Sequence, residues 1–195
     1  MENLTEADKL VYKFKNLFVE NETNNELRII LSKLDINAFI EKLNESINII
    51  EQTIKEYKNE EICVSFNGGK DCCVCLYLYY AVAKHLGVNF PLKIISFEND
   101  HEFVEMKKFQ EYLTKTFYED KFVNTVLNHD LNSVKNNLIR LKEENSPIKC
   151  ILMGNRRTDG FYFDKMKHFS QTDNGWPEFL RVNPILGIFI NKYNF

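Results

Sequence analysis

The sequence predicts an α/β protein built on a parallel, twisted sheet with helices on both faces and a helical N-terminal extension. Two observations carry this prediction. Short apolar runs of strand length alternate with helical patterns between residues 61 and 153. A pair of glycines, Gly68 and Gly69, separates the first of these runs from the helix that follows it. The length of 195 residues predicts one domain.

Four apolar runs have the length and composition of buried strands. They occupy residues 62–66, 92–97, 122–127 and 148–153. Helical patterns lie between them, over residues 71–85, 101–117 and 130–143. Asp130 is a credible N-cap for the last helix. Strands that alternate with helices form parallel sheets, and the crossover connections are right-handed.

The two ends of the chain carry different patterns. Apolar residues at helical spacing over 27–34 and 36–57 predict helices in the first sixty residues. The last forty residues contain Gly, Pro, Asp, Trp and Arg without a steady period, which is typical of an irregular functional segment. The predicted domain of residues 1–195 therefore has three parts: a helical extension (1–60), a core (61–153) and an irregular segment (154–195).

Charge and hydropathy exclude several classes of protein. The net charge is −3 with 25 basic and 28 acidic residues, and no basic block argues for nucleic-acid binding. The N-terminal twenty residues interleave acidic and basic side chains and do not form a secretory signal. No run is long and apolar enough to span a bilayer. We therefore expect a cytoplasmic protein with no membrane or nucleic-acid partner.

The five cysteines do not form a disulfide framework, since their number is odd and three are crowded into one helical turn. Cys72 and Cys75 have the C-x-x-C spacing of a zinc or redox site, but no second cysteine pair or histidine pair accompanies them. We expect buried, reduced thiols that pack as small hydrophobic residues.

The glycine pair indicates a phosphate site. Backbone N–H groups of a tight strand-to-helix turn, together with the positive end of the helix, suit phosphate. Lys70 adds a positive charge, and Asp71 lies where it can cap the helix or bind a metal ion. The loop is neither a Walker A sequence nor G-x-G-x-x-G. An ordinary strand-to-helix turn is the alternative.

Three segments together resemble the eukaryotic-type FAD synthases (FMN adenylyltransferases), members of the PP-loop group that includes the PAPS reductases. The segments run from Ser65 to Cys72 (SFNGGKDC), from Met153 to Asp159 (MGNRRTD) and from Phe169 to Leu186 (FSQTDNGWPEFLRVNPIL). Their order and spacing cover roughly residues 60 to 186. The resemblance implies an adenine-nucleotide alpha-hydrolase-like, Rossmann-like fold.

The resemblance also implies a reaction, in which the phosphate of FMN attacks the α-phosphorus of ATP, FAD forms and pyrophosphate leaves. Residues 61–153 would bind the nucleotide and residues 154–195 the flavin. Mg²⁺ would assist, held by Asn67 and Asp71 through the substrate phosphates. We expect a monomer whose partners are small molecules.

The residues implied for each role fall into three overlapping sets. The catalytic set is Asn67, Asp71, Arg156 and Asp159. The ATP set is Ser65, Phe66, Asn67, Gly68, Gly69, Lys70, Asp71, Ser96, Phe97 and Gly154, where Ser96 and Phe97 rest on topology alone. The flavin set is Arg156, Arg157, Asp159, Thr172, Asp173, Asn174, Gly175, Trp176 and Arg181.

Simpler interpretations exist for several of these residues. Arg156 and Arg157 are also typical of a solvated surface pair, and Trp176 of a core residue. Asp159 would serve as a turn cap, and Lys70 as an exposed lysine.

The chain departs from the family pattern at three places. Gly160 stands where the family usually has Pro, and Gln171 replaces a residue that is often Pro. After Leu186 the family continues with a further helix and a basic tail, which residues 187–195 do not resemble. Two alternatives therefore stay open: another PP-loop enzyme, of the sulfonucleotide reductase or tRNA-thiolating type, and a nucleotide- or flavin-binding domain without turnover.

Overall fold

The computed structural model describes residues 36–89, 91–98, 103–112, 122–128, 133–143, 146–160, 163 and 165–188. The helices are α3 (Ile36–Glu56), α4 (Lys70–His85), α5 (Val104–Tyr112) and α6 (Ser133–Glu143), with short 3-10 turns η1 (Asn59–Glu61) and η3 (Arg157–Asp159). The strands are β1 (Ile62–Ser65), β2 (Leu92–Glu98), β3 (Phe122–Asn128), β4 (Cys150–Leu152), β5 (Phe169–Gln171) and β6 (Leu180–Val182). No helix of these described residues is long and apolar enough to cross a membrane.

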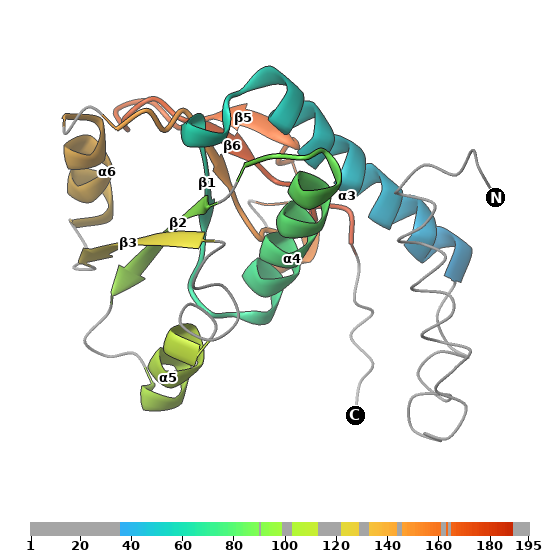
Figure 1. The fold of residues 1–195 in the computed structure, drawn as a ribbon, viewed down its shortest axis with the longest axis horizontal. Helices are drawn as coiled ribbons and strands as arrows, with labels where there is room; N and C mark the ends of the chain where they lie inside the picture. Colours follow the sequence, from blue (N-terminus) through green and yellow to red (C-terminus); the bar gives the residue numbers. More distant parts are fainter. Residues whose placement is uncertain are drawn as a thin grey trace.

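The strands form one sheet in the order β3-β2-β1-β4-β6-β5 (Figure 1). Every neighbouring pair is parallel except β5 and β6, which run antiparallel at one edge. The predicted α/β class and parallel sheet are therefore confirmed. Since β1 and β4 are neighbours, the segments that leave their carboxyl ends lie next to each other.

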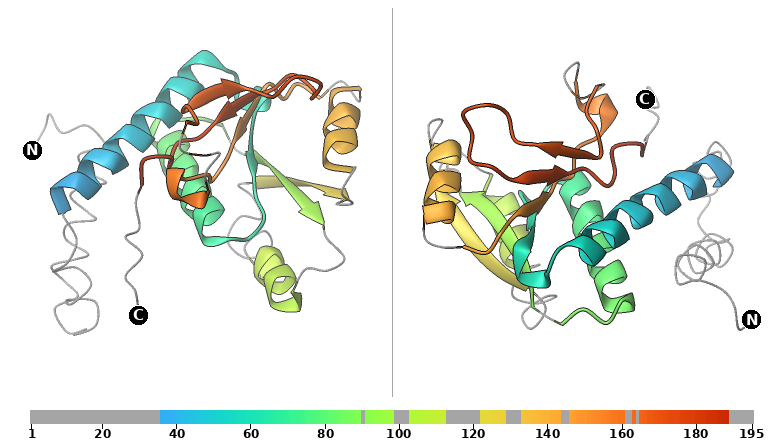
Figure 2. Two further views of the ribbon diagram at one scale, coloured as in Figure 1. Left: turned by 180° about the vertical axis from the view of Figure 1, so that it is seen from behind. Right: turned by 90° about the horizontal axis from the view of Figure 1, so that it is seen from above.

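Alternate residues of the central strands face two separate hydrophobic clusters, as a period of two requires. Val64 of β1 packs in the cluster that contains the buried residues of α3 and α4. Cys63, the residue before it, packs on the other face with Leu138 and Leu141 of α6. Figure 2 shows α3 and α4 together on one side of the sheet and α6 apart from them. Both faces are covered, which explains why the strands are apolar throughout.

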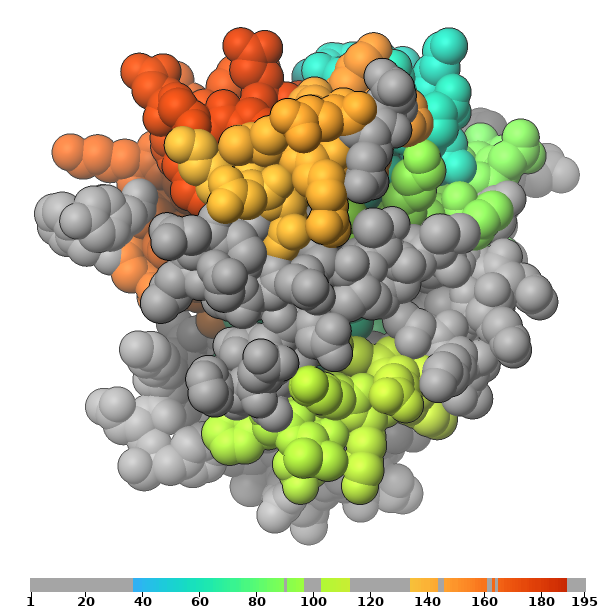
Figure 3. All heavy atoms as spheres, turned by 90° about the vertical axis from the view of Figure 1, so that its left-hand side faces the viewer, coloured from blue at the N-terminus to red at the C-terminus, as the bar shows by residue number. Residues whose placement is uncertain are grey.

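The helix α3 belongs to the core. Leu43, Ile47 and Ile50 on its inward face are at most 4% exposed and pack in the same cluster as α4. The predicted helix over residues 36–57 is confirmed, and the one over 27–34 lies outside the described residues. On the face seen in Figure 3, α6 lies above and α5 below.

The four predicted strands and the helix over 71–85 are confirmed to within two residues at either end. The helix predicted over 101–117 is shorter in the described residues, where α5 runs from Val104 to Tyr112. Asp130, the expected N-cap of the helix predicted over 130–143, lies outside the described residues. In them, that helix is α6, which begins at Ser133.

The prediction of an irregular segment after residue 154 is wrong in part, because β5 and β6 form a hairpin there. Each strand has three residues, which is too short to show a period of two. The backbone of β6 is held in the sheet by pairing with β4 on one side and β5 on the other.

Candidate active site

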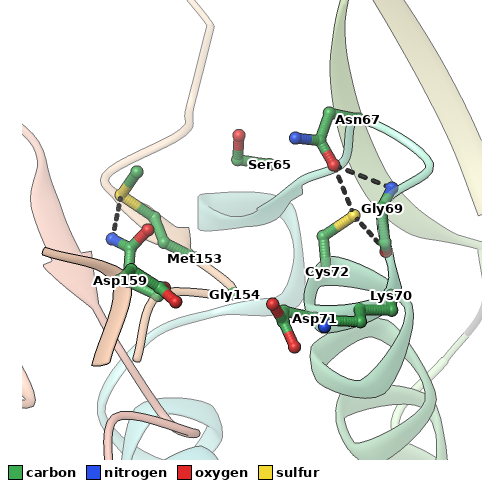
Figure 4. Close-up of a pocket in the computed structure, with 10 residues that line it drawn as sticks. Ser65, Asn67, Gly69, Lys70, Asp71, Cys72, Met153, Gly154 and Asp159 are labelled. Atoms are coloured by element: carbon green, nitrogen blue, oxygen red, sulfur yellow. Dashed lines mark hydrogen bonds between the residues drawn. The ribbon is translucent and has the colours of Figure 1, made fainter. Parts of the chain in front are cut away.

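A pocket of about 410 Å³ lies at the carboxyl ends of β1 and β4 (Figure 4). Its walls come from the glycine loop with the start of α4 and from the segment after β4; they are Ser65, Asn67, Gly69, Lys70, Asp71, Cys72, Met153, Gly154, Asn155 and Asp159. From β1 the sheet continues through β2 on one side and through β4 on the other. Ligands of open α/β sheets bind at such a reversal of strand order.

The glycine loop is held in a tight turn by Asn67. Its Oδ1 accepts hydrogen bonds from the Gly69 N–H at 2.9 Å and from the Cys72 thiol at 2.8 Å. Gly68 has φ +79°, a conformation that glycine adopts without strain. On its far side Gln110 of α5 donates to the Asn67 carbonyl at 2.9 Å. The loop is therefore braced from both α4 and α5.

The loop favours negative charge at the pocket. The Cys73 thiol, through a hydrogen bond, and the backbone N–H groups of Asn67, Gly68 and Gly69 lower the pKa of Cys72, although burial opposes the shift. Cys72 lies in the first turn of α4, where the helix dipole also stabilises an anion. The donors that stabilise a thiolate here suit the oxygens of a phosphate equally well.

Gly154 lets the segment after β4 approach the first turn of α4. A Cβ atom on Gly154 would lie 2.6 Å from the Cys72 backbone nitrogen and 2.8 Å from the Asp71 carbonyl carbon. These neighbours are backbone atoms, which cannot swing aside. Only glycine fits here, and the second motif is thus brought against the first.

Arg156 joins the two motifs by ion pairs. Its Nη2 lies 3.0 Å from Asp71 Oδ2 and 3.1 Å from Asp159 Oδ1. The Arg156 backbone N–H donates to Asp159 Oδ2 at 2.7 Å, so Asp159 also caps the turn η3. The Arg156 side chain is 13% exposed, so the interpretation as a solvated surface residue is wrong. The interpretation of Asp159 as a cap is confirmed.

The structure brings most of the predicted ATP residues to the pocket, namely Ser65, Asn67, Gly69, Lys70, Asp71 and Gly154. Phe66 is 1% exposed and packs in the core, and its N–H donates to the Ile95 carbonyl. Gly68 lies against Met106 and Gln110 of α5. Ser96 and Phe97 lie near the carboxyl end of β2, beside the glycine loop but outside the pocket wall.

The predicted flavin residues after β4 separate into two groups. Asp159 lines the pocket, and Arg156 holds it. Arg157 instead directs its Nη1 to the Met166 carbonyl at 2.9 Å. Its backbone N–H donates to the Leu186 carbonyl, so this arginine ties the motif to the segment after β6.

The loop from Thr172 to Phe179 lies at the other end of the strands from the pocket, and its predicted flavin role stays a prediction. It joins the end of β5 to the start of β6, and β6 runs parallel to β4. The loop therefore lies at the amino ends of the parallel strands, near α6 (Figure 2). A strand of three residues by itself places its amino end about 10 Å from its carboxyl end.

Several of the residues predicted to bind flavin in this hairpin loop make contacts within the loop itself. The Thr172 hydroxyl donates to the Pro177 carbonyl at 2.6 Å and accepts from the Phe179 N–H at 3.2 Å. Arg181 makes two hydrogen bonds of 3.1 Å to the Asp173 carboxylate. Trp176 is 41% exposed, so its interpretation as a core residue is wrong. Asn174 and Gly175 form the exposed turn between them, with Gly175 at φ +82°.

Three pocket residues had no predicted role: Cys72, Met153 and Asn155. All three stand inside the quoted motifs. Their position in the sequence, next to residues with a predicted role, is the signal that could have identified them. The prediction that thiols pack as small hydrophobic residues is confirmed for Cys63, Cys75 and Cys150, each 0% exposed.

Comparison with known proteins shows the family. A phosphoadenosine phosphosulfate reductase domain matches residues 61–189. A probable FAD synthase of Caenorhabditis elegans is 36% identical over 151 residues, which cover 76% of this chain and 28% of that protein. A probable FAD synthase of Schizosaccharomyces pombe is 28% identical over 191 residues, 94% of this chain and 65% of that protein.

The fold comparison agrees. Candida glabrata FMN adenylyltransferase in complex with FMN and the ATP analogue AMPCPP matches with a TM-score of 0.73 at 22% identity, covering 94% of this chain and 62% of that chain. This chain spans less than two thirds of the length of each of these three proteins. The resemblance to FAD synthases is confirmed by these matches. With the glycine loop of β1 and the arginine motif of β4 meeting at one pocket, the chain belongs to the phosphoadenosine phosphosulfate reductase domain family.

Proposed function

We propose that the chain binds ATP in this pocket and transfers its AMP to FMN, which gives FAD and pyrophosphate. The observation that carries the proposal is the ion pair between Arg156 and Asp71, which joins the two motifs across the pocket. Relatives named FAD synthase, and a structural neighbour that binds FMN and an ATP analogue, support the choice of substrates.

The loop and the start of α4 would hold the β- and γ-phosphates of ATP. Backbone N–H groups of the loop and the Lys70 ammonium are the donors on this side, and Ser65 completes the wall. Asn67 keeps the loop in shape through the bonds its Oδ1 accepts. The α-phosphorus would then lie toward Gly154, on the wall of the pocket that the segment after β4 forms.

The reaction needs little covalent chemistry from the protein. An oxygen of the FMN phosphate, largely a dianion at pH 7, forms a bond to the α-phosphorus, and the bond from that phosphorus to the bridging oxygen of pyrophosphate breaks. Positioning and charge stabilisation supply the rate enhancement. Arg156 has a planar fork of donors that matches phosphate oxygens, and in this role it would contact the FMN phosphate or the α-phosphate.

The charges around Arg156 support our proposal that a cation takes part. Two carboxylates, Asp71 and Asp159, share one guanidinium, so the group carries a net charge of about −1 before any phosphate arrives. Asp71 pairs with Arg156 through Oδ2, and its Oδ1 would be the atom that binds the ion. Mg²⁺ takes one or two protein carboxylates and fills its shell with phosphates and water, and it would neutralise charge on the leaving pyrophosphate. Asn67 Oδ1 already accepts two hydrogen bonds, so our Mg²⁺ proposal rests on Asp71.

The flavin side of the pocket would be formed by Arg156 and Asp159. A flavin role for Arg157, Thr172, Asp173, Asn174, Gly175, Trp176 and Arg181 stays a prediction, as do the three-part division of the domain, the monomeric state and the cytoplasmic location. The ATP roles of Phe66, Gly68, Ser96 and Phe97 stay predictions as well.

The test is a turnover assay with FMN, ATP and Mg²⁺, in which FAD and pyrophosphate are both measured. We expect equal amounts of the two products, and loss of both in Asp71→Ala with an unchanged circular dichroism spectrum. Glu51→Ala, on α3 and outside the pocket, is the matched control and should retain the wild-type rate. FMN binding without FAD would favour a binding domain without turnover. Pyrophosphate or AMP release that needs a sulfonucleotide or a tRNA in place of FMN would favour another PP-loop enzyme.

A further inference from the structure

Asn155 is the pocket residue that neither the phosphate loop nor the ion-pair network explains. It follows Gly154 directly and lines the pocket with a half-buried side chain. Its amide carries one acceptor oxygen and a nitrogen with two N–H donors, and these have opposite preferences for a ligand. The chemistry that Asn155 offers to the pocket therefore depends on which of the two groups is engaged elsewhere.

The buried residue Asn183 determines which group of the Asn155 amide is engaged. Asn183 is 0% exposed and follows β6. Its Nδ2 donates to the Lys167 carbonyl at 3.0 Å, and a carbonyl can only accept. The Asn183 nitrogen is thereby fixed toward Lys167, and its Oδ1 faces Asn155. Two further bonds, from the Asn183 N–H to the His168 carbonyl and between the Asn183 carbonyl and His168 Nδ1, both 2.8 Å, hold the backbone of Asn183 in place.

Asn155 therefore has to donate a hydrogen bond to the Asn183 oxygen. Its Nδ2 lies 3.0 Å from Asn183 Oδ1 and 3.9 Å from the sulfur atoms of both Met153 and Met166. A reversed amide would set two oxygens against each other in a site without water access at Asn183, which is unfavourable. Since the nitrogen is engaged with these three neighbours, the polar atom that Asn155 offers to a ligand is the acceptor Oδ1.

The pocket therefore has two chemically different sides. The loop side, with backbone N–H groups and Lys70, donates to phosphate. The opposite side adds two acceptors, Asn155 Oδ1 and the Asp159 carboxylate, beside the Arg156 guanidinium that pairs with Asp159. A ligand that satisfies both sides carries phosphate beside a group with O–H donors. A phosphorylated sugar or polyol has this pattern.

We infer that Asn155, oriented by Asn183, is a specificity-determining residue that accepts a hydrogen bond from a sugar or polyol hydroxyl next to the reacting phosphates. The inference rests on the proposed function, because that function names the two molecules that would supply the hydroxyl: ATP through its ribose and FMN through its ribityl chain. Asn183 acts through Asn155 and is a positioning residue.

Deoxy analogues test the inference and tell the sources apart. The wild-type chain is offered 2′-deoxy-ATP and 3′-deoxy-ATP with FMN, and ATP with an FMN analogue whose chain is 5-phosphopentyl. Dissociation constants are measured with non-hydrolysable forms of the nucleotides, and kcat/KM is measured in parallel. We expect one of these analogues to bind about three- to tenfold more weakly than its parent, as loss of one hydrogen bond predicts.

The matched variants are Asn155→Ala, which removes the acceptor, and Asn183→Ala, which frees the Asn155 amide to turn. Both should bind parent and analogue with equal affinity, so the discrimination ratio falls to about one; a purely structural role would weaken both ligands alike and keep the ratio. Wild-type chain that binds every analogue as well as its parent overturns the inference, whether or not the variants fold. Full discrimination retained in Asn155→Ala overturns it too. Binding is measured independently of turnover. Absence of FAD would therefore count against the proposed function, while the ratio of dissociation constants would still test the role of Asn155.

Discussion

Arg156 Nη2 lies 3.0 Å from Asp71 Oδ2, and this ion pair links the segment after β4 to the first turn of α4. Both side chains are largely buried, with 13% and 22% exposure. Removing one partner of such a pair leaves the other charge without its counter-charge, which costs more than breaking an exposed pair. The pair therefore couples the architecture of the pocket to its electrostatics.

Replacing Arg156 by lysine should reduce turnover strongly. Lysine keeps the charge but cannot contact Asp71, Asp159 and a phosphate with a planar fork of donors. We expect kcat/KM for FAD formation to fall about 100-fold or more, with a smaller effect on ATP binding. Arg140→Lys on the exposed face of α6 is the control. Equal rates for Arg156→Lys and wild type would remove Arg156 from the reaction.

Replacing Gly154 by alanine should separate the two motifs. The new Cβ would lie 2.6 Å from the Cys72 nitrogen, so the segment after β4 must move away from α4. We expect a loss of about 1–3 kcal/mol in the free energy of unfolding, with at least tenfold weaker ATP binding measured by calorimetry.

Gly87→Ala provides the matched comparison for Gly154→Ala. Gly87 has φ +68° and follows the far end of α4, so alanine there strains the backbone by about 1–2 kcal/mol without reaching the pocket. We expect similar destabilisation and unchanged ATP affinity. Parallel losses of affinity in both variants would show that Gly154 acts only through stability.

Replacing Arg181 by lysine tests the hairpin loop. Arg181 holds Asp173 and the Gln171 carbonyl at the edge of the sheet opposite the pocket. We expect a lower melting temperature because the bidentate contact to Asp173 is lost, and an unchanged KM for FMN if the loop serves the fold alone. A raised KM for FMN with an unchanged KM for ATP would instead support the flavin role that the sequence motif predicts for this loop.

Cys72 should be alkylated before the other cysteines. Hydrogen bonds from the Cys73 thiol and the loop N–H groups lower its pKa, so its thiolate forms at lower pH than that of an ordinary cysteine. Hydrogen bonding to Cys72 raises the pKa of Cys73, and burial raises those of Cys63 and Cys75 and, to about 12, that of Cys150.

Mass spectrometry after iodoacetamide treatment at pH 7 checks this order. Labelling should concentrate on Cys72, disappear in Cys72→Ser and slow at least fivefold when AMPCPP fills the pocket. Labelling of Cys72 at the same rate with and without the nucleotide analogue would contradict an ATP site at this place.

Glu45 on α3 should make the chain sensitive to acid. Its hydrogen bond with Lys42, together with the charges of Lys42 and His168, lowers its pKa in the folded state despite some burial. A lowered carboxyl pKa stabilises the fold above the unfolded value of about 4.3. That contribution disappears as the pH falls through the folded pKa.

Urea unfolding between pH 3 and 6 of wild type and Glu45→Gln measures this contribution. Wild type should be the more stable at pH 6, and the difference should shrink below about pH 4.3. Glu41→Gln, on the exposed side of the same helix, is the control. A difference that does not change with pH would show that Glu45 acts through packing alone.

Local signals explain what the sequence predicts well. The apolar run at Ile62–Val64 and the pair Gly68–Gly69 each depend on near neighbours in the chain, so β1, the loop and the start of α4 are predicted correctly. The strand β6 is different, because Arg181 interrupts its apolar pattern and its backbone is held by β4 and β5.

Contacts between distant segments are what the sequence does not contain. The pairs Arg156–Asp71 and Asn155–Asn183 form only once β1, β4 and β6 lie side by side. The placement of Thr172–Trp176 depends on the direction of β6 relative to β4, which a motif alone does not specify. The motif leaves open at which end of the strands these residues lie.

The transfer of label from ATP tests the central claim most directly. The chain is incubated with FMN, Mg²⁺ and ATP labelled with ³²P at either the α- or the γ-phosphorus. Adenylyl transfer predicts that the α-label appears in FAD and the γ-label in pyrophosphate, in equal amounts. Label from the γ-phosphorus on the acceptor, or no label in any flavin product while the folded chain binds both substrates, would contradict it.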